Sequence, residues 1–262
     1  HLTENRRQRE PWELAALARL RSGDTDTALN TYLERGRVVI APDGAKARSR
    51  MVTDWLDARR AGSAVMLASR RGDVDALNKA ARTVLRAEGT IGPDQILVAG
   101  QGFADGDVVV ALRNDRRLGL LNGTRAVVEQ VDTDHQVIRC RAEDGQAVNV
   151  PFGYVADGHL AHGYAMTIHK SQGATYDRCL ILAGDQLTKE PAYTAMSRGR
   201  IGNTMYLVDN NQRETEAHAD EIEPSLVDRV RASISRTGAQ SMAIEQTAEL
   251  GDDVDTDVGM DL

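Results

Sequence analysis

The sequence is poor in aromatic residues, which make up 4% of its 262 positions. Proteins that bind single-stranded nucleic acids often stack the bases on aromatic rings, and this chain has few residues for that mode of binding. Its apolar runs are also short, as in Val108–Leu112 and Cys179–Ala183. Because a helix needs about 20 apolar residues to cross a bilayer, we predict no membrane span.

Further absences concern metals, export and nucleotides. The two cysteines lie far apart without C-x-x-C spacing, which argues against a zinc site and a disulfide framework. We therefore predict no metal site and a reducing, cytoplasmic location. No export signal is visible, and the chain begins at His1 rather than Met, which indicates a fragment. A G-x-x-x-x-G-K-[ST] loop, which cradles nucleotide phosphates, does not occur.

The formal net charge of −7 is unevenly distributed. From Asp209 onward there are 14 acidic and 4 basic residues, a net charge of −10, whereas the preceding part carries 28 basic and 25 acidic residues, a net charge of +3. Nucleic-acid binding depends on local clusters of Lys and Arg rather than on the total, so the charge neither excludes nor supports a DNA partner. We expect the acidic segment 209–262 to be disordered, with a helix possible over residues 224–235.

The first hundred residues alternate between helical and strand patterns. The spacing of apolar residues predicts helices over 10–22, 24–35, 45–60 and 73–88 and strands over 38–40 and 64–68. Such alternation is typical of right-handed βαβ units, which build a parallel sheet. We therefore predict an α/β fold.

The pattern changes to short strands between residues 102 and 157. Strands are predicted over 107–112, 125–131, 136–142 and 147–150, and Asn122-Gly123 and Asp144-Gly145 favour tight turns. These strands are sufficient for a small β-barrel inserted into the α/β domain. After them we predict a helix over 158–169, a strand over 179–183, a helix over 191–198 and a strand over 204–208. The chain is thus divided into residues 1–101, 102–157, 158–208 and 209–262.

One polar segment in the last part of the α/β domain is Tyr193-Thr-Ala-Met-Ser-Arg-Gly-Arg200. It resembles motif VI of superfamily 1 DNA helicases, in which the arginine of Y-x-A-x-[ST]-R is the arginine finger, and Arg198 has that position. A permanently charged guanidinium suits this role, because negative charge develops at the γ-phosphate during ATP hydrolysis. Taken alone, an arginine at a helix end is usually a surface residue that complements the helix dipole.

The segment Thr167-Ile-His-Lys-Ser-Gln-Gly173 resembles motif V of the same helicases, which contacts single-stranded DNA and relays to the nucleotide. The resemblance assigns Thr167, His169 and Lys170 to DNA contacts and Gln172, Gly173 and Arg200 to the nucleotide side. Its polar groups suit binding of phosphodiester oxygens rather than readout of bases. The alternative is an ordinary polar loop. Many of these helicases have Glu where this chain has Thr175, so the chain departs from the family at the contact with the nucleotide sugar.

Two stretches nearer the N-terminus also match these helicases. Leu2–Trp12 resembles the Arg-Gln segment that opens the second motor domain of RecD-like helicases, which implies that Arg7 is a second γ-phosphate sensor. A solvated charge cluster is the alternative there. Leu67–Asn78, followed by Arg82, resembles a strand and helix of the family. The resemblance implies DNA-backbone contacts for Ser69 and Arg70, and helix capping is the alternative.

The insert begins with Gly106-Asp-Val-Val-Val, continues through Arg113-Asn-Asp and reaches Asn122-Gly123. This order resembles the Src-homology-3-like barrel inside the second motor domain of RecD-like helicases. The resemblance makes Arg113, Asn114, Arg116 and Arg117 candidate DNA contacts, although basic turns on small barrels are mostly solvated. With so few aromatic residues, electrostatic contacts to the DNA backbone would have to dominate binding.

Across residues 1–208 the motifs resemble the C-terminal motor half of a RecD-like superfamily 1B helicase, most closely the helicase part of MobF-type conjugative relaxases. The resemblance implies a RecA-like domain without its own phosphate loop, 5′ to 3′ translocation on single-stranded DNA, and ATP and Mg²⁺ held mainly by an upstream RecA-like domain. The chain alone is then expected to be inactive as an ATPase. A RecD-like repair helicase or exonuclease subunit, and a non-catalytic module that binds DNA or a partner, are the alternatives.

The helicase interpretation depends on the orientation of one side chain. Arg198 is expected to reach out of its own lobe, on the side that carries residues 167–173, toward a nucleotide held by the other lobe. Burial within its own lobe, or an orientation away from those residues, would argue against the interpretation.

Overall fold

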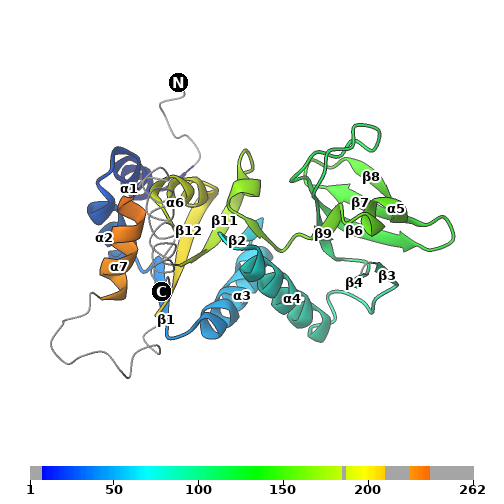
Figure 1. The fold of residues 1–262 in the computed structure, drawn as a ribbon, viewed down its shortest axis with the longest axis horizontal. Coiled ribbons are helices and arrows are strands. Elements are labelled where there is room, and N and C mark those ends of the chain that lie inside the picture. The colour runs from blue at the N-terminus through cyan, green and yellow to red at the C-terminus, as the bar shows by residue number, and fades with distance from the viewer. Residues whose placement is uncertain (1–7, 99, 185–186, 210–224, 237–262) are drawn as a thin grey trace, which may run out of the picture.

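The computed structural model describes residues 8–98, 100–184, 187–209 and 225–236. They form an α/β lobe and a smaller, mainly β insert, arranged next to each other along the long axis of the molecule (Figure 1). No helix among the described residues is long and apolar enough to cross a membrane. Arg7 and most of the acidic segment, residues 210–224 and 237–262, lie outside the described residues.

A five-stranded parallel sheet forms the centre of the lobe. Its strands are β1 (Val38–Ala41), β2 (Ala64–Ala68), β10 (Ala165–Thr167), β11 (Tyr176–Ala183) and β12 (Gly199–Val208), in the order β1-β12-β11-β2-β10. Every neighbouring pair is parallel. β2 is buried along its whole length, as expected for a parallel strand with both faces covered. The predicted α/β fold with a parallel sheet is therefore confirmed.

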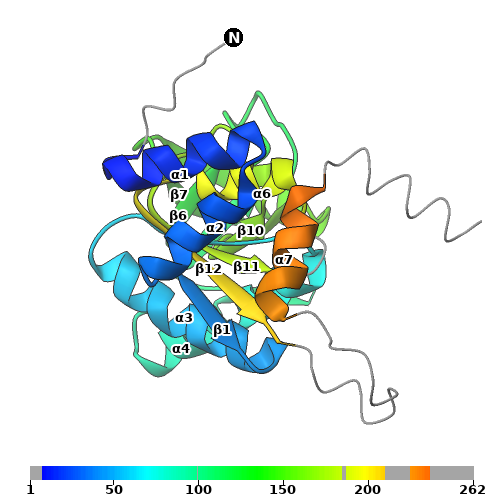
Figure 2. The same cartoon turned by 90° about the vertical axis from the view of Figure 1, so that its left-hand side faces the viewer.

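Helices cover both faces of this sheet (Figure 2). α1 (Pro11–Ser22), α2 (Thr25–Glu34), α6 (Lys189–Met196) and α7 (Leu226–Ser235) pack on one face, and α3 (Gly44–Arg60) and α4 (Arg71–Ala87) pack on the other. Local sequence sets their ends: Pro11 starts α1, Gly23 ends it with a φ of 95°, and Asp43 caps α3 by accepting from the Lys46 N–H. The helices predicted over residues 10–22, 24–35, 45–60 and 73–88 are confirmed as α1, α2, α3 and α4.

The helix that the sequence allows over residues 224–235, within the acidic segment, is present in the structure as α7. Leu226, Val230 and Ile234 recur every fourth residue, are buried, and contribute to the apolar core of the lobe. Ser225 caps the helix by accepting from the Asp228 N–H. This stretch is therefore part of the lobe and not of a solvated tail.

The insert is an antiparallel β structure with its own core. A hairpin of β3 (Ile96–Val98) and β4 (Gln101–Phe103) precedes a sheet of β5 (Val108–Ala111), β6 (Arg125–Asp132), β7 (Val137–Ala142), β8 (Ala147–Pro151) and β9 (Leu160–His162), with α5 (Phe152–Ala156) before the last strand. The sheet order is β8-β7-β6-β5-β9. Buried and exposed residues alternate along β7 and β8, so one face packs around Phe103 and Ile138. The strands predicted for the insert are confirmed.

The predicted helix over residues 158–169 is wrong. The chain forms β9 in the insert, β10 in the lobe and a 3₁₀ turn, η1 (His169–Ser171). Asn78 fixes β10, because its side-chain amide accepts from the Ala165 N–H at 2.7 Å and donates to the Ala165 carbonyl at 3.1 Å. A short apolar run does not by itself distinguish a buried strand from a helix, and pairing with β5 and β2 decides in favour of strands. The later strands and helix are found as predicted, in β11, β12 and α6.

A buried ion pair joins the insert to the lobe. Arg82 of α4 donates from Nε and Nη2 to the two carboxylate oxygens of Asp107, both at 2.9 Å. Asp107 is 0% exposed and also accepts from the Tyr164 hydroxyl and from the Ala104 N–H. A bidentate pair of this kind fixes direction as well as distance, so it sets the orientation of the insert.

Arg125 makes the reciprocal contact from the insert to the lobe. Its Nε donates to the Gly163 carbonyl at 2.9 Å, and its guanidinium lies 5.2 Å from the centre of the Tyr176 ring. Tyr176 is the first residue of β11, so the insert contacts the strand that follows the motif V-like segment.

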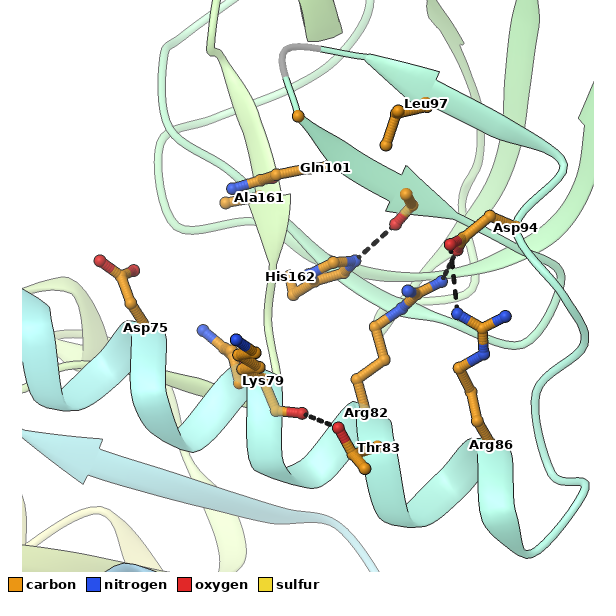
Figure 3. A pocket seen from close by; sticks show the side chains of 13 residues that line it. Asp75, Lys79, Arg82, Thr83, Arg86, Asp94, Leu97, Gln101, Ala161 and His162 are labelled. Carbon is orange, nitrogen blue, oxygen red and sulfur yellow. Dashed lines mark hydrogen bonds and ion pairs between the residues drawn. The ribbon is translucent and has the colours of Figure 1, made fainter.

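A cavity of about 500 Å³ opens beside this joint, between α4 and the β3–β4 hairpin (Figure 3). Arg82 and Arg86 line it from α4, and His162 lines it from β9. Asp94 forms ion pairs with both arginines, so their charges are compensated within the protein. Burial lowers the pKa of His162, which favours the neutral imidazole. The cavity is therefore part of the joint and not a strongly cationic surface.

Candidate nucleotide and DNA contact site

The segment 167–175 runs across the lobe from the carboxyl ends of the parallel strands to their amino ends. We call these two sides of the sheet the carboxyl edge and the amino edge. It begins at the carboxyl end of β10, where the Ile168 N–H donates to the Ala68 carbonyl at 3.1 Å. It ends at the amino end of β11, where the Tyr176 N–H donates to the Arg198 carbonyl at 3.0 Å. Because β10 and β11 both run parallel to β2, the segment connects two groups of predicted site residues at opposite edges.

Several predicted DNA contacts gather at the carboxyl edge. Ser69 and Arg70 directly follow β2 and are exposed, and His169 is exposed after β10. Thr167 is half-buried, and its Oγ1 accepts the Lys170 N–H at 3.4 Å. Arg70 precedes α4 without a side-chain capping bond, so the capping alternative has no support for this residue. DNA contact by these side chains stays a prediction.

Lys170 lies between this edge and the insert. It is half-buried, and burial, followed by the positive charge of Arg71, lowers its pKa. The insert approaches through Gly123, where an added Cβ would lie 3.3 Å from the Lys170 carbonyl oxygen. The preceding Asn122 N–H donates to Oδ1 of Asn114 at 2.7 Å. Asn114 thus shapes the turn that meets Lys170, and its predicted DNA contact would use the amide nitrogen.

The arginines predicted to contact DNA from the insert lie on the same loop. Arg113, Arg116 and Arg117 are exposed. Nη1 of Arg113 lies 3.0 Å from Nε2 of His159. The structure therefore brings the insert's basic loop next to the segment 167–175 through Gly123, whereas DNA contact itself stays a prediction.

Arg198 lies at the amino edge, but its side chain does not extend from the lobe. It is 8% exposed, and its guanidinium donates to the Thr194 carbonyl at 2.8 Å, to Ser197 Oγ at 2.8 Å and to the Ala174 carbonyl at 3.3 Å. The last contact places it beside residues 167–173, as the interpretation requires. Its burial contradicts the expectation that it reaches outward. The final turn of α6 offers carbonyls without intrahelical partners, which a nearby guanidinium satisfies.

The other residues predicted on the nucleotide side are exposed. Gln172 and Gly173 lie on the surface, and Gly173 has a φ of 88°, which favours glycine. Arg200 donates to Asp177 at 2.6 Å. A hydrogen bond from the Ser63 backbone and the bond from Arg200 lower the pKa of Asp177. Arg200 therefore has an anionic partner within the lobe, and its contact with a nucleotide stays a prediction.

Sequence reasoning missed a buried polar network that holds the start of β12, directly after Arg198. Glu13 of α1 is 0% exposed and accepts from the backbone N–H and the side-chain amide of Asn203, at 3.1 and 2.8 Å. It also accepts from the Tyr32 hydroxyl at 3.2 Å. Asn203 in turn accepts from the Gly199 N–H at 2.9 Å. A single acidic residue in an amphipathic helix carries no sequence signal for such burial.

The start of the described chain contacts the same end of β12. Gln8 is 4% exposed and donates to the Gly199 carbonyl at 3.0 Å. A Cβ at position 199 would collide with the Gly202 carbonyl and with Asn203, so close packing requires glycine there. Gln8 therefore reaches the residue directly after Arg198, whereas Arg7 lies outside the described residues.

Glu13 predicts a pH dependence of stability. Burial raises its pKa above 4.5, and hydrogen bonds from Asn203 and Tyr32 oppose the rise. The folded state thus holds the proton more tightly than the unfolded chain, so this stabilisation is complete below pH 4.5 and is lost as the pH rises through the raised pKa. Glu13→Gln keeps an accepting oxygen and does not titrate. We expect the free energy of unfolding of Glu13→Gln, measured by urea titration, to increase relative to that of the wild type as the pH rises toward neutral.

The exposed neighbour Glu10 provides the control for this measurement. Glu10→Gln is expected to follow the pH dependence of the wild type. A difference between Glu13→Gln and the wild type that does not change with pH would contradict a carboxyl group titrating in the core.

The chain is similar to conjugal transfer proteins and to helicases. No protein-family profile matches it. Conjugal transfer protein TraA of Rhizobium radiobacter is 35% identical over 204 residues, which are 76% of this chain and 18% of that protein. ATP-dependent DNA helicase Pif1 of Bdellovibrio bacteriovorus is 32% identical over 118 residues, which are 40% of this chain and 26% of that protein. The chain thus spans less than a fifth of the length of the TraA relative.

A solved structure shows the same fold. The crystal structure of Pif1 helicase from Bacteroides in complex with ADP-AlF3 and ssDNA superposes with a TM-score of 0.53 at 18% identity, and the match covers 93% of this chain and 55% of that chain. The sequence relatives and the shared fold agree with the two motif-like segments at the ends of β10 and α6. We conclude that the chain is related to part of the TraA conjugal transfer proteins and of a Pif1 helicase and shares the fold of a solved Pif1 structure.

Proposed function

We propose that this chain is the C-terminal motor half of an ATP-dependent DNA helicase that moves 5′ to 3′ on single-stranded DNA. The observation that carries the proposal is the path of the segment 167–175. One end lies among exposed polar side chains at the carboxyl edge, and the other end accepts a hydrogen bond from Arg198 through the Ala174 carbonyl. A single short segment can therefore pass a displacement between a DNA contact and a nucleotide contact.

In this proposal, ATP and Mg²⁺ are held mainly by an upstream RecA-like domain, because the chain has no phosphate loop. Among the residues that the structure describes, no cluster of His, Cys, Asp and Glu could hold a metal ion. The chain alone is then inactive as an ATPase. Arg198 is the arginine finger, with Arg7 as a second sensor of the γ-phosphate. Gln172, Gly173 and Arg200 lie on the nucleotide side.

The burial of Arg198 within its own lobe counts against this role, whereas its bond to the Ala174 carbonyl, beside residues 167–173, supports it. Its guanidinium already lies beside the segment 167–175, and its acceptors include neutral oxygens of Thr194, Ser197 and Ala174. Charge-assisted hydrogen bonds to anionic phosphate oxygens are roughly twice as strong as bonds to neutral acceptors. A nucleotide in the other lobe would therefore compete with these neutral oxygens for the guanidinium.

Single-stranded DNA binds along the carboxyl edge in this proposal. The contacts come from Ser69, Arg70, Thr167, His169 and Lys170 of the lobe and from Arg113 and Asn114 of the insert, which we take to be a Src-homology-3-like barrel. Binding through phosphates is sequence-tolerant and salt-dependent.

The relatives favour one type of helicase over another. The matched relatives from three rhizobial and agrobacterial sources are conjugal transfer proteins by name. We therefore place this chain in a conjugative relaxase-helicase acting in the cytoplasm, and not in a RecD-like repair subunit. A relaxase domain is then expected in the upstream part that this chain does not span.

Salt-dependent binding of single-stranded DNA tests the proposal. Lys170→Ala is expected to weaken binding and to reduce the slope of log K against log salt by about 0.7, the value for one lost phosphate contact on a single strand. Fluorescence anisotropy of a labelled oligonucleotide over a salt series gives both quantities. Arg60→Ala removes a positive charge from an exposed residue at the end of α3 and is expected to leave the slope unchanged. Equal slopes for both variants and the wild type would count against DNA binding at this edge.

A further inference from the structure

Leu121 is an exposed apolar side chain in a basic loop. It is 62% exposed, although leucine is usually buried. It lies on the loop between β5 and β6, which also carries the exposed Arg116 and Arg117. These two arginines make no side-chain hydrogen bond or ion pair with any residue that the structure describes. The loop therefore presents an apolar group flanked by free positive charge.

The loop holds Leu121 in place through its own hydrogen bonds. Asp115 and Leu120 exchange two backbone hydrogen bonds, at 2.8 and 2.9 Å. The Leu121 N–H donates to Oγ1 of Thr124 at 3.2 Å, and the Gly123 N–H donates to the Ala111 carbonyl at 2.8 Å. An exposed side chain on a pre-organised loop loses little entropy when it meets a ligand. The exposure of Leu121 is therefore a property of an ordered loop.

The same loop lies against the segment expected to bind DNA phosphates. Gly123, two residues after Leu121, packs on the Lys170 carbonyl, because a Cβ at 123 would lie 3.3 Å from that oxygen. Leu121 thus lies two residues along the chain from the contact with the segment that carries His169 and Lys170. A strand whose phosphates reach Lys170 would bring its bases near the loop.

The chain offers no exposed aromatic side chain for base stacking. Its 2 Trp, 6 Tyr and 2 Phe residues all lie among the described residues, and none of them is exposed. Unpaired bases nevertheless expose apolar faces, and burial of such faces is favourable against any apolar group. The large apolar side chain available beside the basic segment is Leu121.

We propose that Leu121 packs against a base of single-stranded DNA whose phosphates are bound by Lys170 and the arginines of the loop. The contact is apolar and does not distinguish between bases, which suits a protein that moves along DNA of any sequence. This inference rests on the proposed function, because it requires single-stranded DNA at the carboxyl edge.

Leu121→Ser and an abasic oligonucleotide test the contact together. Affinities of the 262-residue chain are measured by anisotropy for a short oligothymidylate and for an abasic oligonucleotide of the same length. Loss of one buried leucine contact is expected to weaken binding to oligothymidylate by about three- to tenfold. Binding to the abasic strand is expected to be unchanged by the substitution, and the salt slope is expected to be that of the wild type. Leu97→Ser is the matched control, because Leu97 is 73% exposed on the β3–β4 hairpin of the same insert.

The outcomes separate this inference from the proposed function. Salt-dependent binding by the wild type, with Leu121→Ser equal to Leu97→Ser, would overturn the base contact alone. Equal weakening on both oligonucleotides would assign Leu121 to the DNA backbone or to a protein contact, which also overturns it. If the wild type binds neither oligonucleotide, the proposed function and this inference both fail. Thermal unfolding of the variants shows whether a loss of binding comes from misfolding.

Discussion

Replacing Arg198 by alanine, in the protein that includes the upstream motor domain, is expected to lower DNA-stimulated ATP hydrolysis by about 10³-fold or more. The finger acts on charge that develops in the transition state, so kcat is expected to fall while the KM for ATP changes little. Binding of single-stranded DNA is expected to persist, because Lys170 and the exposed carboxyl edge are unchanged. Steady-state ATPase assays and anisotropy measure the two quantities separately.

The buried position of Arg198 calls for a second variant. Arg198→Ala also leaves the Ala174 carbonyl without the Arg198 donor, whereas the Thr194 carbonyl keeps its bond from the Ser197 hydroxyl, and an unsatisfied buried group destabilises by about 1–3 kcal/mol. Arg198→Lys keeps a cation and a donor but lacks the fork that matches phosphate oxygens. It is expected to unfold like the wild type and still to lose most of the hydrolysis.

Arg60→Ala, at an exposed position with its own acidic partners, is the control for general loss of positive charge. It is expected to hydrolyse ATP at the rate of the wild type. Unchanged hydrolysis in both Arg198 variants would remove this residue from the nucleotide site. The chain would then be better explained as a module that only binds DNA or a partner.

Removing the carboxylate of Asp107 is expected to have the largest effect on stability. Asp107→Ala leaves Arg82, 9% exposed, with only its bond to Asp94 among the described contacts, and leaves the Tyr164 hydroxyl without an acceptor. Breaking a buried pair by deleting one partner typically destabilises by about 3–5 kcal/mol. We expect a loss of this size in urea or thermal unfolding, together with faster hydrogen exchange at the joint between the insert and the lobe.

Two comparisons show whether the charge pair is the cause. Asp134→Ala, at an exposed position of the insert, is expected to change stability by less than about 0.5 kcal/mol. The double substitution Arg82→Met with Asp107→Leu removes both charges and is expected to recover much of the loss, because no charge is then left buried alone. A single Asp107→Ala variant as stable as Asp134→Ala would show that this pair does not hold the joint.

Local patterns determined most of the elements of this protein. Pro11, Gly23 and the apolar spacing of α3 and α4 predict helices within two residues of their observed ends, because caps and amphipathic periodicity act within a few residues. The alternation of elements and the turn dipeptides likewise predict the parallel sheet and the β insert. The two motif-like segments indicate the family, because their residue order is itself the signal.

Contacts between distant parts of the chain decided the rest. Residues 158–169 form strands because β5, β2 and Asn78 lie beside them, and no nearby residue encodes those partners. Arg198 turns inward because the end of α6 and the Ala174 carbonyl meet in the folded lobe. Glu13 and Asn203, 190 residues apart, hold the start of β12 directly after Arg198. A periodic pattern shows which face of an element is buried, whereas the partner that satisfies a buried polar group is known only once the chain has folded.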